Sequence, residues 1–95
     1  MYITLSGGDS MRTFTYKIKD SAGIHARPAG MLVKQAEQFD SDIEISLNGK
    51  SADAKRLFSV MGLGAAKDDE ISVKITGPDE EKAETEILNF LRTSL

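Results

Sequence analysis

The sequence has 95 residues, 40% of them hydrophobic, which is enough for one domain with a single modest core. It contains no cysteine, which excludes disulfides and thiolate metal sites and fits a reducing cytoplasm. No apolar run approaches the roughly 20 residues of a transmembrane helix, and we expect no signal peptide. The net charge is −3, with the acidic excess in residues 77–95, so the chain lacks the basic surface typical of nucleic-acid-binding proteins.

The first part of the chain predicts a strand and a helix after a leader. Residues 1–12, with a Gly-Gly pair and little periodicity, are expected to form a flexible leader before a domain that spans residues 13–95. Apolar and polar residues then alternate from Thr13 to Ile18, which predicts a half-buried strand. In residues 26–39 the apolar residues recur at spacings of three and four, which predicts an amphipathic helix.

The rest of the chain predicts a hairpin, a short helix, a strand and a last helix. Residues 43–47 alternate as a strand, and Asn48 and Gly49 after them are a strong hairpin signal because both turn positions need a positive φ. The elements expected next are a strand at residues 50–53, a short helix within residues 54–64, a strand at residues 71–75 and a final helix near the end. Asp79 precedes this final helix, and we expect its side chain to cap it.

The predicted element order is β-α-β-β-α-β-α. The economical packing for these elements is an α+β open-faced sandwich, in which a four-stranded, mostly antiparallel sheet carries three helices on one face. Periodicity does not give the order of the strands in space. A ferredoxin-like arrangement, which has the same element order apart from the final helix, therefore remains an alternative.

The segment GIHARPAG, residues 23–30, contains the only histidine and lies where the first helix is expected to begin. The first amides of a helix have no carbonyl partners and carry partial positive charge, which favours an anion such as a phosphoryl group. Ala26 and Pro28 would form the first turn, where the missing N–H of proline is tolerated. His25 can act as a nucleophile when neutral, and Arg27 can bind phosphate oxygens. These groups suffice to accept a phosphoryl group and hold it briefly.

Simpler interpretations of His25 are also open. A lone histidine before a helix is most often a cap or a surface residue. A single imidazole without cysteine makes a poor metal site, so we expect neither a metal nor a cofactor. The chain has no Walker loop, no paired carboxylates near this histidine and no second histidine, so we expect it not to be an enzyme.

The predicted short helix is apolar almost all round, and a two-turn helix on a sheet can bury only one face. Some of its apolar side chains must therefore be exposed, and an apolar patch with a polar rim is typical of a docking surface. The alternative is that several of these residues are simply core. The residues of this predicted patch are Leu57, Phe58, Val60, Met61 and Leu63, with Lys55 and Arg56 at its rim.

Two long segments of the chain carry a family pattern. They read GIHARPAGMLVKQAEQFDSDIEI and NGKSADAKRLFSVMGLGAAKDDEISVKITGPDEEKA. Over residues 13–93 the chain closely resembles HPr, the histidine-containing phosphocarrier of the bacterial phosphoenolpyruvate-dependent sugar phosphotransferase system. The resemblance implies the open-faced sandwich fold. It also implies that His25 carries the phosphoryl group on Nδ1 beside Arg27, receives it from enzyme I charged by phosphoenolpyruvate, and passes it to sugar-specific IIA components.

The resemblance further implies a docking surface for these protein partners and a cytoplasmic location. A carrier that exposes one face to successive partners is expected to be a monomer. The positions that match the family's partner contacts are Gly30, Lys34, Lys55, Leu57, Phe58 and Met61.

Two alternative functions remain open. A carrier for the nitrogen-related branch would keep the histidine and would differ in which enzyme I phosphorylates it faster. A regulatory binding module would use the apolar patch alone to contact a transcription factor or an enzyme, and replacement of His25 would then leave binding intact.

In many family members a serine opens the short helix and is phosphorylated by an ATP-dependent kinase, mainly in Gram-positive bacteria, but Arg56 occupies this position here. We expect no serine switch at this position, because neither Ser51 nor Ser59 aligns with it and Arg56 adds a permanent positive charge. Incubation with such a kinase and ATP, followed by mass spectrometry, should find the short helix unmodified. Stoichiometric phosphoserine there would contradict this expectation.

Overall fold

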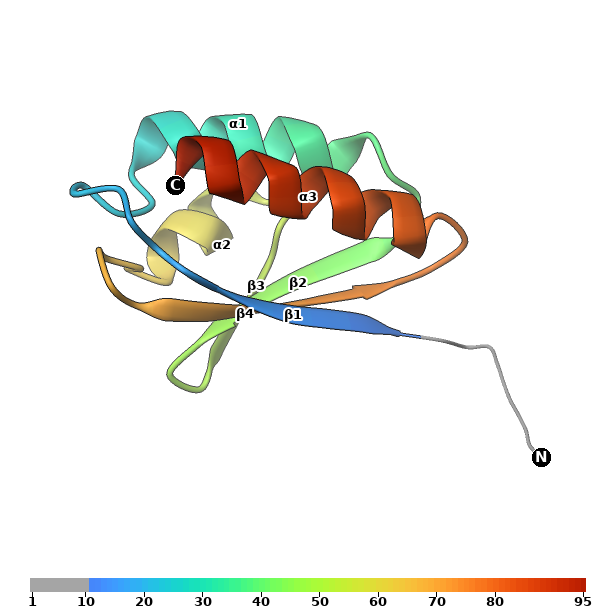
Figure 1. Ribbon diagram of the computed structural model, residues 1–95, viewed down its shortest axis with the longest axis horizontal. Coiled ribbons are helices and arrows are strands. Elements are labelled where there is room, and N and C mark those ends of the chain that lie inside the picture. Colours follow the sequence, from blue (N-terminus) through green and yellow to red (C-terminus); the bar gives the residue numbers. More distant parts are fainter. Residues whose placement is uncertain (1–10) are drawn as a thin grey trace.

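The computed structural model describes residues 11–95 of the chain. The leader predicted for residues 1–12 therefore lies outside the described residues, apart from Met11 and Arg12. Within the described range, four strands and three helices follow one another in the predicted order (Figure 1). They are β1 (Arg12–Lys17), α1 (Ala26–Glu37), β2 (Asp42–Leu47), β3 (Lys50–Asp53), α2 (Leu57–Gly62), β4 (Glu70–Thr76) and α3 (Glu80–Ser94).

These strands form one antiparallel sheet in the order β1-β4-β2-β3, and the helices lie over the same face of it (Figure 1). This is the predicted α+β open-faced sandwich. β1 pairs with the last strand, where Phe14 lies opposite Val73, and β4 pairs in turn with β2, where Val73 lies opposite Ile45. The predicted hairpin joins β2 to β3, and Asn48 and Gly49 adopt φ values of 52° and 84°.

The core lies between the sheet and the helices, because each element turns one apolar face inward. Alternate residues of β2 and β4 are buried, as the period of a strand requires, and the helices contribute stripes at spacings of three and four. The buried residues include Ile43, Ile45, Ile71, Val73 and Ile75 from the sheet and Ala29, Leu32, Ala36, Ala83, Ile87 and Leu91 from the helices. Packing on this common core places α1 beside α3 (Figure 1).

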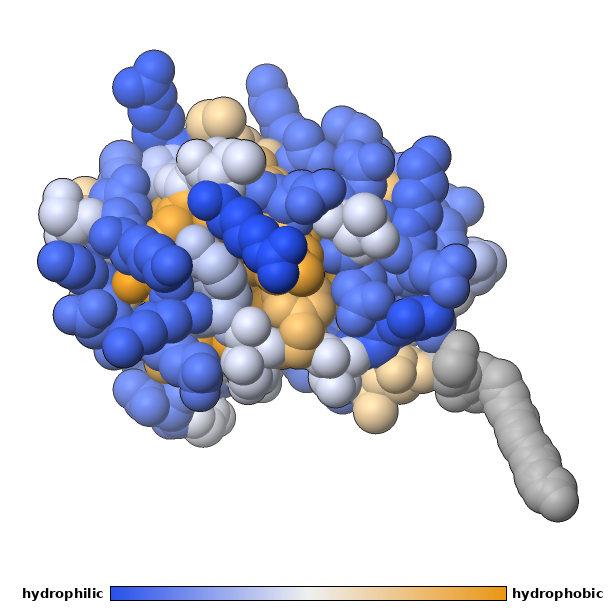
Figure 2. Space-filling model, in the orientation of Figure 1, coloured by the Kyte–Doolittle hydropathy of each residue, from blue (hydrophilic) through white to orange (hydrophobic). Residues whose placement is uncertain are grey.

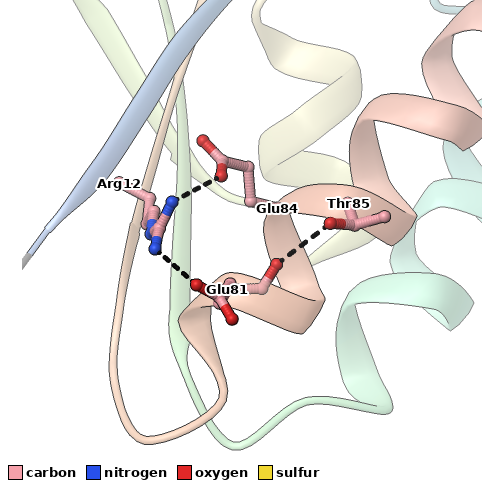
Figure 3. A network of polar contacts seen from close by, with 4 residues as sticks. All are labelled: Arg12, Glu81, Glu84 and Thr85. Atoms are coloured by element: carbon pink, nitrogen blue, oxygen red, sulfur yellow. Dashed lines mark hydrogen bonds and ion pairs between the residues drawn. The ribbon is translucent and has the colours of Figure 1, made fainter.

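An arginine on the edge strand links α3 to the sheet. Polar side chains cover most of the face that carries α3 and β1, with apolar residues visible between them (Figure 2). On β1, the Arg12 guanidinium lies 2.8 Å from Glu81 Oε2 and 3.2 Å from Glu84 Oε1 (Figure 3). Because the Glu81 side chain is 81% exposed, its ion pair contributes little to the free energy of unfolding.

The prediction that the Asp79 side chain caps α3 is wrong. Asp79 immediately precedes the helix, but its carboxylate makes no hydrogen bond to the first turn. It accepts hydrogen bonds from Asp40 N at 2.9 Å, from Ser41 N at 3.0 Å and from the Ser41 hydroxyl. Glu80 Oε1 instead accepts the Gly77 N–H at 2.9 Å. Asp79 thus joins the β4–α3 connection to the loop after α1, and these hydrogen bonds, that of the Ser41 hydroxyl above all, lower the pKa of its carboxyl group.

We predict that Asp79→Asn removes a pH-dependent stabilisation. Because the pKa of Asp79 is lower in the folded than in the unfolded chain, its contribution is present above the unfolded value and is lost as the pH falls through the folded one. The free energies of unfolding of wild type and variant, measured in urea, should differ at pH 7, and the difference should shrink below about pH 4. Ser41→Ala, which removes the main donor, should show a smaller effect of the same form. A difference that stays constant into strong acid would contradict this role.

Candidate functional site

A tight turn before α1 positions the histidine. Hydrogen bonds from Gly23 N to Asp20 O at 3.0 Å and from Ala22 N to Asp20 Oδ1 at 2.8 Å close this turn. Gly23 has a φ of +68°, and a Cβ at this position would overlap the carbonyl oxygen of Ala65. Only glycine fits this approach, which also lets the Ile24 N–H donate to the same Ala65 carbonyl at 2.9 Å.

His25 is the last residue before α1, which begins at Ala26 as predicted. Its backbone is extended, with φ −93° and ψ −178°, and its carbonyl accepts the first helical hydrogen bond from Ala29 N at 3.0 Å. The imidazole does not cap the helix, and the residue is exposed to solvent. The interpretation of His25 as a side-chain cap is therefore wrong, and its ring is accessible to a reacting group.

The first turn of α1 offers two unpaired backbone donors. The N–H groups of Ala26 and Arg27 meet no acceptor within residues 11–95. Pro28 follows them and has no N–H, so it leaves no third donor. Partial positive charge from the helix dipole gathers at this end, and no acidic side chain in the first turn offsets it. This end of α1 can therefore accommodate an anion.

Arg27 is exposed beside this turn, and its guanidinium forms no ion pair in the part of the chain that the structure describes. It lines a shallow hollow of about 380 Å³ together with His25 and Pro28. The hollow lies where the start of α1 meets the carboxyl-terminal end of α3 (Figure 1). The remaining residues that line it are Asp20, Met31 and Ser94.

These last three residues were not predicted from the sequence. Met31 follows Arg27 by four residues, so the helical period alone could have placed both on one face of α1. It is 49% exposed although its side chain is large and apolar. Asp20 and Ser94 reach the hollow only because a turn meets the far end of α3 there, and no sequence pattern indicates such a meeting.

The short helix α2 packs against α1 and exposes part of its apolar surface. Phe58 is 84% exposed, whereas Val60 and Leu63 are buried in the core. Leu57 and Met61 are half-buried against that core. The exposed part of the predicted patch therefore consists of Phe58 with Leu57 and Met61 at its base.

The other predicted contact residues lie on α1 and before α2. Gly30 and Lys34 are four residues apart on α1, so they share one face of it, and Lys34 is exposed. Lys55 is half-buried, and its ammonium donates a hydrogen bond to the Phe39 carbonyl oxygen at 2.8 Å. Arg56 is the residue before α2 and is exposed. Gly30, Lys34 and Arg56 are therefore accessible to a partner as they stand. The ammonium of Lys55 would first have to break its hydrogen bond to Phe39.

Three further observations concern metal ligands, membrane spans and the acidic segment. Within residues 11–95, no three histidine, cysteine, aspartate or glutamate side chains gather where they could hold a metal ion, and no helix has the length and apolar character to cross a membrane. Glu80 and Glu81, at the start of α3, lie at the opposite end of that helix from Ser94 and the hollow (Figure 1). The acidic segment therefore begins away from the histidine.

Comparison of the sequence with known proteins identifies a family. The family model described as "PTS HPr component phosphorylation site" matches residues 12–93. The phosphocarrier protein HPr of Buchnera aphidicola subsp. Baizongia pistaciae is 44% identical over 77 residues, which cover 81% of this chain and 91% of that protein. The HPr of Buchnera aphidicola subsp. Schizaphis graminum is 46% identical over 79 residues, which cover 83% and 92%.

Solved structures give the same result. A histidine-containing phosphocarrier protein from a mycoplasma has a TM-score of 0.85 at 32% identity, with 87% of this chain and 94% of that chain covered. An HPr from Thermoanaerobacter tengcongensis has a TM-score of 0.83 at 30% identity, with 86% and 92% covered. The fold and these matches define a phosphocarrier protein, which is not itself a catalyst. The chain belongs to the HPr family of the phosphotransferase system.

We predict that Gly23→Ala destabilises the protein by about 2–4 kcal/mol, because the new Cβ adds backbone strain and overlaps the Ala65 carbonyl. The measurement is the free energy of unfolding in urea. Gly30→Ala is the matched control, since a Cβ there meets nothing within 4 Å and alanine is the better helix former. It should stabilise the protein by about 0.5–1 kcal/mol. Equal effects of the two substitutions would refute the close approach at Gly23.

Proposed function

We propose that His25 accepts a phosphoryl group from enzyme I, which phosphoenolpyruvate charges, and passes it to sugar-specific IIA components for sugar uptake. The observation that carries this proposal is an exposed imidazole at the start of α1, beside two amides and the Arg27 guanidinium, which have no partner within residues 11–95. The description of the matching family as a phosphorylation site supports it.

Each transfer forms one bond to phosphorus and breaks another. The neutral imidazole of His25 attacks the phosphorus atom through Nδ1, as the family resemblance implies, while the bond from phosphorus to the donor breaks. Phosphoryl transfer has a loose transition state, so positioning and charge stabilisation matter more than covalent assistance. The Arg27 guanidinium and the N–H groups of Ala26 and Arg27 stabilise the charged oxygens. In the second transfer the P–N bond breaks as the IIA acceptor forms its own bond to phosphorus.

Partners dock on the exposed surface next to His25. Phe58 offers apolar area, and the cationic side chains of Arg56 and Lys34 suit an acidic partner surface. A small patch supports weak, short-lived complexes, which suit a carrier that meets two partners in turn. The proposed contact residues are Gly30, Lys34, Lys55, Arg56, Leu57, Phe58 and Met61.

We propose that the protein is a monomer, because a carrier must leave one face open to successive partners. A cytoplasmic location follows from the family resemblance. One similar protein is described as having a different oligomeric state. The Bacillus subtilis catabolite repression protein Crh, at 26% identity, is described as a dimer with a swapped domain. A stable dimer of this chain that covered His25 and Phe58 would be incompatible with the proposal.

Labelling with radioactive phosphoenolpyruvate tests the proposal. In the presence of enzyme I, the wild type should acquire acid-labile label and His25→Ala should acquire none. Arg27→Ala should be labelled about 10- to 100-fold more slowly, because the transition state loses the guanidinium that lines the hollow. A wild type without acid-labile label, or a His25→Ala variant that keeps it, would refute the proposal. Faster labelling by the enzyme I of the nitrogen-related branch would assign the carrier to that branch instead.

A pair of surface variants provides the control for docking. Phe58→Ala should raise the KM of enzyme I for this protein about tenfold, because the variant loses apolar docking area. The free energy of unfolding should not change, because the Phe58 side chain is 84% exposed. Met11→Ala removes another exposed apolar side chain, 56% exposed, just before β1, and should leave the KM unchanged. If both variants behave alike, the exposed part of α2 is not the docking surface.

A further inference from the structure

We infer that Asp20 limits how tightly the site holds its phosphoryl group, because it places a negative charge in the same hollow. This inference rests on the proposed phosphorylation of His25. It assigns a role to a residue that no sequence pattern indicated.

Two backbone hydrogen bonds fix the position of Asp20, and a third fixes its carboxylate. Its Oδ1 accepts the Ala22 N–H at 2.8 Å, and the carbonyl of Asp20 accepts the Gly23 N–H at 3.0 Å. The backbone N–H of Asp20 donates to the carbonyl oxygen of Leu95 at 2.9 Å, which ties the turn to the end of α3. The carboxylate cannot leave this position without breaking a hydrogen bond, and Asp20 lines the hollow that the imidazole also lines.

The charges around the hollow are few and opposed. Arg27 supplies its permanent positive charge and Asp20 its negative charge. No ion pair joins these two side chains in the described part of the chain, so neither charge is neutralised by direct contact with the other. The uncharged residues that complete the lining are Pro28, Met31 and Ser94.

A phosphoryl group on His25 brings close to two negative charges into this hollow. Arg27 and the two amides attract it, whereas the Asp20 carboxylate repels it. Asp20 therefore raises the free energy of the phosphorylated chain relative to the unphosphorylated chain. The chain becomes a better phosphoryl donor than a site with Arg27 alone would be, at the expense of a lower affinity for the group.

Phosphoryl exchange between the wild type and Asp20→Asn measures this effect directly. Asparagine keeps an oxygen that can accept the Ala22 N–H, so the substitution removes the charge and retains the turn. Purified phosphorylated wild type is mixed with an equal amount of the unphosphorylated, ¹⁵N-labelled variant and a catalytic amount of enzyme I, which breaks the P–N bond on one chain and forms it on the other. At equilibrium, the variant should hold about two- to sixfold more of the phosphoryl group than the wild type. This ratio, measured by mass spectrometry, should fall toward one in about 1 M salt.

Asp53→Asn is the matched control. Asp53 Oδ1 accepts the Lys55 N–H at 2.9 Å in the same kind of turn, but Asp53 does not line the hollow, so its exchange ratio should be one. A ratio of one for Asp20→Asn, or a ratio that salt leaves unchanged, would overturn the inference while the proposed function stands. Failure of enzyme I to transfer the group to any chain, the wild type included, would overturn the proposed function and the inference with it.

Discussion

The approach of the Gly23 backbone to Ala65 is the contact on which the site depends. It places the turn before α1 against the segment that follows α2, and the Ile24 N–H extends it by binding the Ala65 carbonyl. Because Ala65 comes three residues after the end of α2, this contact sets both the start of α1 and the place of the exposed Phe58 relative to it. The imidazole of His25 and the apolar patch are therefore positioned by backbone packing, which is more rigid than positioning by long side chains.

Local patterns predicted the elements because alternation and spacing record which face of each element is buried. The hairpin at Asn48 and Gly49 and the start of α1 after His25 were predicted in this way and are confirmed. The order of the strands in the sheet could not be predicted, since a strand shows the same alternation of apolar and polar residues whichever strand it pairs with. β1 in fact pairs with β4, which is far from it in the sequence. Resemblance to HPr, and not periodicity, selected the open-faced sandwich over the ferredoxin-like alternative.

Side-chain partners could be predicted only where the partner is local. Asp79 precedes α3 and so predicted a cap, but the loop after α1 offers three donors from Asp40 and Ser41, and the carboxylate binds these instead. No sequence pattern indicated Asp20, because its place in the hollow arises from a turn and a helix end that meet only in the folded chain. The sequence could place His25 and Arg27 together because both residues lie within one helical turn of each other.

Pro28 limits the number of backbone donors that the start of α1 offers to an anion. The start of a helix normally presents several unpaired N–H groups, and such a set binds many small anions without discrimination. With proline as the third residue of α1, only the N–H groups of Ala26 and Arg27 remain. Free inorganic phosphate should therefore bind the start of α1 only weakly, with a Kd of about 1 mM or higher. A phosphoryl group that is covalently bonded to His25 would remain in place without tight non-covalent binding.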